Sequence, residues 1–131
     1  MIERVRIIRR RLIKDDRGWF FKAMTGKEEG LPLHFGEVYL TMGYPGQVKG
    51  GHYHPSAQEW FTIIAGKAVL RLMDVESKTQ MSITMTLDDQ FTVYVPNGVA
   101  HEFENIGDTD MIVLAYSDLQ YDPSDTIPFK L

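Results

Sequence analysis

Three histidines and one glutamate are the residues of this sequence whose types and spacing could do chemistry. His52, His54 and Glu59 form the pattern H-x-H-x₄-E, and His101 follows well downstream. Alternate side chains of a β-strand point to the same face, so the two imidazoles of the His-x-His pair would lie together. Imidazoles and carboxylates bind divalent transition metals, and histidine is also the commonest acid or base in enzymes. The pattern predicts a metal site, a proton-transfer site, or both.

The predicted metal ligands are His52, His54, Glu59 and His101. Zinc is the first expectation for such a nitrogen and oxygen set, and iron, manganese, nickel and cobalt are alternatives. The chain has no cysteine, which excludes a thiolate ligand, a cysteine nucleophile and a disulfide framework. The absence of cysteine agrees with a reducing cytoplasm, which we expect as the location.

Composition predicts one ordinary globular domain spanning residues 1–131. No signal peptide is visible, and no apolar run approaches the length of a membrane span. Residues 1–27 carry nine Lys and Arg against three acids, whereas the remainder carries five against fifteen. A basic segment in an otherwise acidic chain does not favour nucleic-acid binding.

The elements that would position the site are short strands. The clearest period-2 pattern places Met81, Ile83 and Met85 on one face and polar residues between them. No segment shows a helical pattern, and short strands at this spacing predict a sandwich or a small barrel that encloses one ligand. We expect strands within residues 5–13, 19–24, 35–42, 58–64, 68–75, 81–87, 91–95, 100–106 and 110–116, and an irregular tail from 118 on.

Two motifs resemble those of the cupin superfamily. Gly46, His52, His54, Glu59 and Gly66 fit the first motif in full. The second motif fits through Pro96, Gly98, His101 and Asn105, except that Gln90 stands where its first glycine is expected. The resemblance implies an all-β cupin fold, a double-stranded β-helix or jelly-roll barrel with the ligands facing its interior.

A narrower resemblance covers most of the chain. Residues 16–20, 49–53 and 96–103 are similar to segments of the dTDP-4-dehydrorhamnose 3,5-epimerases, and the His-x-His pair resembles that of dTDP-sugar 3,4-ketoisomerases. Residues 105–111 and 121–126 resemble the end of the metal-binding C-terminal cupin of a capsular polysaccharide synthesis enzyme. The resemblance implies an epimerase or ketoisomerase that acts next to the keto group of a nucleotide-linked 4-keto-6-deoxy hexose in polysaccharide biosynthesis.

The resemblance leaves two mechanisms open. Without metal, His52 would be the base, as in the epimerases, and Tyr116 the acid, with Tyr39 as the next candidate. With metal, His52 would be a ligand and could not take a proton from the substrate. Glu59 favours the metal version, because the ketoisomerases usually have glutamine here and a carboxylate adds negative charge for a divalent ion.

Substrate binding is expected from Arg17 and Lys49, which could hold a diphosphate, and from Trp60, which could stack on a sugar or base. Arg17 could equally pair with Asp15 or Asp16, and Phe20, Phe61 and Phe91 are expected in the core. An exposed sheet edge and the resemblance favour a homodimer. Two other functions stay open: a different metal-dependent cupin enzyme, such as a dioxygenase or decarboxylase, and a non-catalytic cupin that binds sugar or metal.

Overall fold

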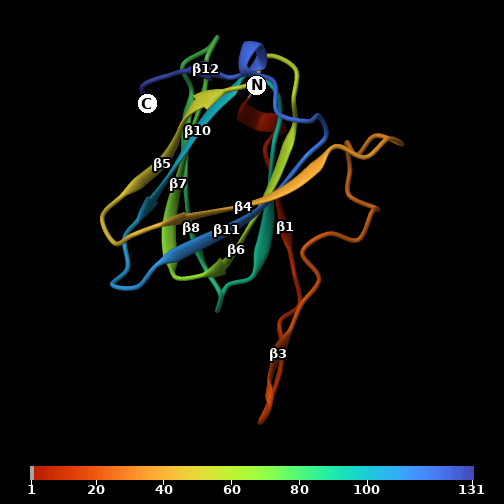
Figure 1. Ribbon diagram of the computed structural model, residues 1–131, viewed down its shortest axis with the longest axis vertical. Helices are drawn as coiled ribbons and strands as arrows, with labels where there is room; N and C mark the ends of the chain where they lie inside the picture. Colours follow the sequence, from red (N-terminus) through yellow and green to blue (C-terminus); the bar gives the residue numbers. More distant parts are fainter. Residues whose placement is uncertain (1) are drawn as a thin grey trace.

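The computed structural model describes residues 2–131 and consists of two facing antiparallel sheets (Figure 1). The first sheet has the order β1 (Arg6–Arg9), β9 (Phe91–Val95), β6 (Glu59–Ala65), β11 (Met111–Ser117) and β4 (Glu37–Gly43). The second has the order β12 (Ile127–Pro128), β5 (Val48–Tyr53), β10 (Val99–Asn105), β7 (Lys67–Asp74) and β8 (Gln80–Thr86). This architecture confirms the predicted all-β jelly roll.

Helical structure in residues 2–131 is limited to two single 3₁₀ turns, η1 (Ile2–Arg4) and η2 (Pro123–Asp125). Neither turn could cross a membrane, and no other described segment forms a helix that could.

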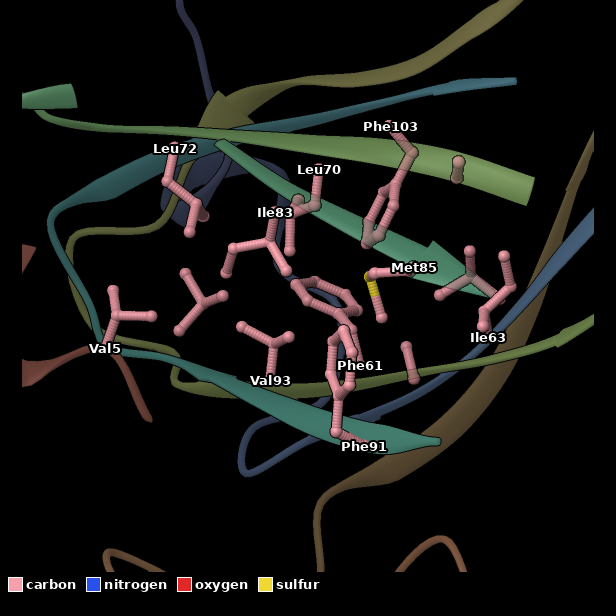
Figure 2. Packing of buried hydrophobic residues seen from close by; sticks show 14 of the residues in the cluster. Val5, Phe61, Ile63, Leu70, Leu72, Ile83, Met85, Phe91, Val93 and Phe103 are labelled. Atoms are coloured by element: carbon pink, nitrogen blue, oxygen red, sulfur yellow. The ribbon is translucent and has the colours of Figure 1, made fainter. Parts of the chain in front are cut away.

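The space between the sheets holds the hydrophobic core. Phe61, Val93, Leu70, Phe103 and Met85 interdigitate there, each at most 3% exposed (Figure 2). Each strand sends every second side chain inward, which is the physical basis of the period-2 pattern. Removal of this apolar surface from water is the dominant stabilising contribution, roughly 25 cal/mol for each Å².

The predicted first strand is interrupted, and this changes the structure near the amino terminus. β1 ends at Arg9, and the chain then forms a separate hairpin from β2 (Ile13–Asp15) and β3 (Gly18–Phe20). The hairpin projects away from the two sheets, at the bottom of Figure 1. Phe20 is 57% exposed, so its predicted place in the core is wrong, whereas Phe61 and Phe91 are buried as predicted.

The loop of residues 21–36, between β3 and β4, covers the outer face of the first sheet. Trp60, Tyr94 and Tyr116 form a second apolar cluster on this face, and Met24 and Leu31 of the loop pack against it. Arg10 ties the loop to the sheet: its Nη2 lies 2.7 Å from Glu28 Oε2, and its Nε donates to Thr92 Oγ1 at 3.0 Å. Both the inner and the outer face of the central strand β6 are therefore buried.

Candidate functional site

Strand pairing brings two of the histidines together. β5 and β10 are antiparallel neighbours, and His52 lies opposite His101. The next residue pair is Glu102 with Gly50, so Gly51 is an extra residue that forms a bulge. Gly50 and Gly51 have φ of +97° and +86°, a region that favours glycine. A Cβ on Gly50 would also come within 2.9 Å of the His101 carbonyl oxygen, so the bulge beside the site requires a glycine there.

The third histidine follows immediately after β5. The ring centroids of His52, His54 and His101 are 4.9 to 5.5 Å apart. One ligating nitrogen of each ring lies within 4.8 Å of the others, which brings the three imidazoles close enough to share one metal ion.

Glu59 lies beside this group at the start of β6. Its carboxylate is almost completely buried, and Oε1 lies 2.9 Å from His54 Nε2 and 3.2 Å from His101 Nε2. Oε2 accepts a hydrogen bond of 2.5 Å from the hydroxyl of Tyr39. Tyr39 belongs to β4 of the first sheet, His101 belongs to β10 of the second sheet, and His54 follows β5 of the second sheet. Groups from both sheets therefore position the carboxylate.

The hydrogen bonds of the imidazoles fix their tautomers. His54 Nδ1 lies 2.8 Å from the carbonyl oxygen of Asp125, and His101 Nδ1 lies 3.1 Å from that of Val99. A carbonyl oxygen only accepts, so both Nδ1 atoms carry the proton. In the neutral rings, both Nε2 lone pairs then face the Glu59 carboxylate.

Lone pairs that converge in this way need a cation between them. His101 Nε2 and Glu59 Oε1 are both buried and have no hydrogen-bond partner. Unpaired polar atoms are costly in a protein interior, and a proton or a metal ion would satisfy both at once. Ring nitrogens whose opposite N–H donates to a carbonyl are also typical of metal ligands. The residues therefore fit a divalent transition metal.

The surroundings shift the pKa values of the site. Burial, together with the neighbouring His101 and His54, lowers the pKa of His52 to about 4. Burial opposes ionisation of Glu59, but its contacts with His101 and His54 hold the pKa well below its usual range. Burial and the Glu59 charge raise the pKa of Tyr39 above its usual value. At neutral pH the site has a neutral His52, an ionised Glu59 and a protonated Tyr39.

A cavity of about 330 Å³ opens beside these groups. Tyr39, His52, His54 and Glu59 line one part of it, and residues 119–122, 125 and 126 line another. Among the described residues, its lining includes four acids and neither lysine nor arginine. The cavity has the dimensions of a small-molecule site, and the charge of its lining does not favour a phosphate deep inside.

Two predicted site residues lie on the wrong face of the first sheet. Ser117 lies opposite Glu59 in the β11–β6 pairing and lines the cavity, so the preceding Tyr116 points outward. The Tyr116 hydroxyl accepts a hydrogen bond from the Gly36 backbone at 3.1 Å. Trp60 is 1% exposed and packs on Tyr94 with ring centroids 5.0 Å apart. Neither Tyr116 as the acid nor Trp60 as a stacking residue is compatible with this geometry.

The two predicted phosphate-binding residues do not line the cavity. Arg17 lies in the projecting hairpin, where its Nη2 is 2.7 Å from Asp15 Oδ2, the pairing considered above as the alternative. Lys49 is exposed on β5, where its side chain lies beside Gly43. Within one chain, the structure does not bring either cation to the histidines.

Sequence reasoning missed Ser117 and Asp125. Ser117 could have been found from the alternation in residues 111–117, which places it on the face of Val113 and Ala115. Asp125 belongs to residues 121–126, whose resemblance to a capsular polysaccharide synthesis enzyme is described above. Its contact with His54, however, joins residues that are 71 positions apart in the sequence. No local pattern predicts such a contact.

Comparisons with known proteins agree with the fold. Residues 13–127 match the family described as polysaccharide biosynthesis C-terminal domain. The spore coat polysaccharide biosynthesis protein SpsL of Bacillus subtilis (strain 168) is 30% identical over 128 residues, which cover 94% of this chain and 84% of SpsL.

Two solved structures show the same architecture. A dTDP sugar isomerase from Desulfovibrio desulfuricans G20 has a TM-score of 0.88 at 20% identity, covering 96% of this chain and 83% of that one. The capsular polysaccharide assembling protein CapF from Staphylococcus aureus has a TM-score of 0.71 at 29% identity; 93% of this chain matches 33% of CapF. The chain therefore belongs to the polysaccharide biosynthesis C-terminal domain family and has the cupin fold.

Proposed function

We propose that this protein is a metal-dependent sugar-nucleotide epimerase or ketoisomerase of polysaccharide biosynthesis. It would act next to the keto group of a nucleotide-linked 4-keto-6-deoxy hexose. The observation that carries the proposal is the convergence of three imidazoles and Glu59 beside a cavity of about 330 Å³. Relatives described as polysaccharide biosynthesis proteins and a structural neighbour described as a dTDP sugar isomerase support this choice of substrate.

The metal would be held by His52, His54, His101 and Glu59. Zinc suits this ligand set, and iron, manganese, nickel or cobalt would also fit it. A bound divalent ion supplies electrophilic assistance, because it stabilises negative charge on a carbonyl oxygen. The protons next to a keto group are acidified when that charge is stabilised, which is the requirement of epimerisation and keto-group migration.

Tyr39 is the proposed proton-transfer residue. It lines the cavity, and its hydroxyl donates to Glu59 Oε2, so Glu59 orients it. The hydroxyl is protonated at neutral pH, so Tyr39 can supply a proton but cannot take one from the substrate. His52 is the alternative base if the site works without metal, because it is neutral at pH 7 and lines the same cavity.

We also propose a homodimer. The hairpin exposes Ile13, Trp19 and Phe20 away from its own sheets, and the outer face of the edge strand β4 exposes Val38 and Leu40. Exposed apolar surface of this kind is typical of protein interfaces. In a dimer, Arg17 would also be able to contact a phosphate of the substrate bound to the partner chain, because the hairpin is remote from the cavity of its own chain. Lys49 does not line the cavity of its own chain, and its role in substrate binding stays a prediction.

Isotope exchange tests the reaction directly. The purified protein is incubated in D₂O with a panel of dTDP- and UDP-linked 4-keto-6-deoxy sugars, and mass spectrometry follows deuterium at C3 and C5. Deuterium uptake that requires bound metal supports the proposal. No uptake with any sugar would overturn it, and uptake that survives chelation would move the proton transfer to metal-free His52. Oxygen consumption or CO₂ release from small acids would instead indicate a different cupin enzyme.

A further inference from the structure

The segment before β12 makes three contacts with the loop that carries His54. Asp125 Oδ1 accepts a hydrogen bond from the Ser56 backbone at 2.8 Å, and Oδ2 accepts one from the Ala57 backbone at 3.0 Å. The carbonyl oxygen of Asp125 accepts from His54 Nδ1 at 2.8 Å. One residue therefore holds both the imidazole and the chain that follows it.

This part of the chain is itself held in place. Asp122 caps η2, since its Oδ1 accepts from the Ser124 backbone at 2.9 Å and from the Ser124 hydroxyl at 2.7 Å. The Asp125 backbone N–H donates to the Asp122 carbonyl at 2.9 Å. On the other side, β12 pairs with β5, with Ile127 opposite Tyr53. The Asp125 carbonyl is thus fixed from both directions.

His54 lies beyond the strand that carries His52. His52 and His101 lie within paired strands, which fix their backbones through the sheet. His54 follows the end of β5, and the loop after it leads to Glu59. Asp125 holds the backbone of this loop at residues 56 and 57, between two of the proposed ligands.

We infer that Asp125 is a positioning residue for the metal centre. Its carboxylate docks η2 onto the loop, so that its carbonyl accepts from His54 Nδ1 and directs Nε2 toward Glu59. Any residue at 125 has a carbonyl, so the specific contribution of the aspartate is the docking. This inference rests on the proposed metal site, and it assigns Asp125 a role that it performs through His54.

Metal affinity tests the inference. Zn²⁺ binding is measured by chelator competition for the unmodified protein, Asp125→Ala, Asp125→Asn and Asp108→Asn. Asp108 is an exposed residue of the β10–β11 turn, so its variant controls for the lost charge. Asp125→Ala should bind zinc about 10- to 100-fold more weakly, as is usual when the group that supports a ligating histidine is lost. Asp125→Asn keeps one acceptor and should lose less, and Asp108→Asn should bind like the unmodified protein.

Two further measurements separate positioning from general damage. Because Asp125 acts through His54, Asp125→Ala should weaken binding far less in a His54→Ala background. The visible spectrum of the Co²⁺-loaded protein should also change in Asp125→Ala, because a displaced imidazole alters the ligand geometry. Equal zinc affinity in Asp125→Ala and the unmodified protein would overturn the inference, as would equal losses in both backgrounds.

The metal-free protein keeps the inference testable on its own. In ¹⁵N-histidine spectra, the His54 Nδ1–H signal should be protected from exchange and should lose that protection in Asp125→Ala. If the unmodified protein binds no metal but this signal depends on Asp125, the proposed metal fails while the positioning role survives. If the exchange protection of this signal is the same in Asp125→Ala, the positioning role fails. Should Asp125→Ala not fold, the same comparison is made with Asp125→Asn, whose shape matches aspartate.

Discussion

Glu59 and Trp60 are neighbours in β6, are equally buried, and serve opposite purposes. Glu59 faces the interior, where its Oε1 meets two imidazoles beside a cavity. Trp60 faces outward and is sealed between Tyr94, Tyr116 and the covering loop. Trp60 Nε1 also lacks a hydrogen-bond partner, but it is a lone donor among apolar rings. Burial alone therefore does not mark a candidate functional residue; the convergence of several unpaired polar atoms does.

Substitutions on the inner face should remove activity and leave the fold intact. His52→Asn should lower deuterium exchange by about 10²- to 10⁴-fold, because both proposed mechanisms depend on this ring. The free energy of unfolding, measured in urea without metal, should change little, since His52 is only half-buried. Unchanged exchange would show that the inner face does not hold the reaction.

Substitution on the outer face should have the reverse effect. Trp60→Ala removes a fully buried side chain and should lower the free energy of unfolding by about 3–5 kcal/mol. The rate of deuterium exchange per folded molecule should be close to that of the unmodified protein. It is measured at low temperature, and near-UV circular dichroism gives the folded fraction. A large loss of exchange without a loss of stability would place Trp60 in the site after all.

The two tyrosines provide a matched pair. Tyr39→Phe should slow exchange by about 10- to 100-fold, because it removes the proposed acid and its hydrogen bond to Glu59. Tyr116→Phe should leave exchange unchanged and lower stability by about 1 kcal/mol, because it removes the acceptor of the Gly36 N–H. Both variants are assayed by exchange and by urea unfolding; equal effects on exchange would contradict the assignment of β11 faces.

An effect on stability that depends on pH is expected in the loop that covers the outer face. Burial opposes ionisation of Glu28, but hydrogen bonds from Thr25 and Arg10 lower its pKa from 4.5 to about 2. A carboxyl whose pKa is lower in the folded state stabilises the protein above its unfolded pKa. This contribution should be about 1–2 kcal/mol above pH 4.5, allowing for solvent screening, and should vanish as the pH falls toward 2.

Urea unfolding from pH 6 to pH 3, compared with Glu28→Gln, measures the contribution of Glu28. The stability difference between the two proteins should shrink as the pH falls. A difference that is constant with pH would show that the Arg10–Glu28 pair is not the anchor of the loop.

The sequence predicted the strands and the site to the extent that each depends on local patterns. Alternation identified the strand at residues 81–87, and two motifs identified His52, His54, Glu59 and His101. The position of Trp19 and Phe20 could not be predicted, because strand propensity does not show whether a hairpin packs on its own sheets. Tyr116 was misplaced because its aromatic type was given more weight than its register, and register decides the face.

The contact between His54 and Asp125 also sets the order of events when the protein is made. The two residues are 71 positions apart, so a chain still being synthesised has its histidine pair long before it has the group that orients one of them. Proteins rich in contacts of long sequence separation fold slowly. Ions that meet the histidines early would find a loose, open arrangement. Selective binding of the proposed metal would therefore begin only after the two sheets have packed together. The folded protein, rather than the nascent segment, would determine which ion binds.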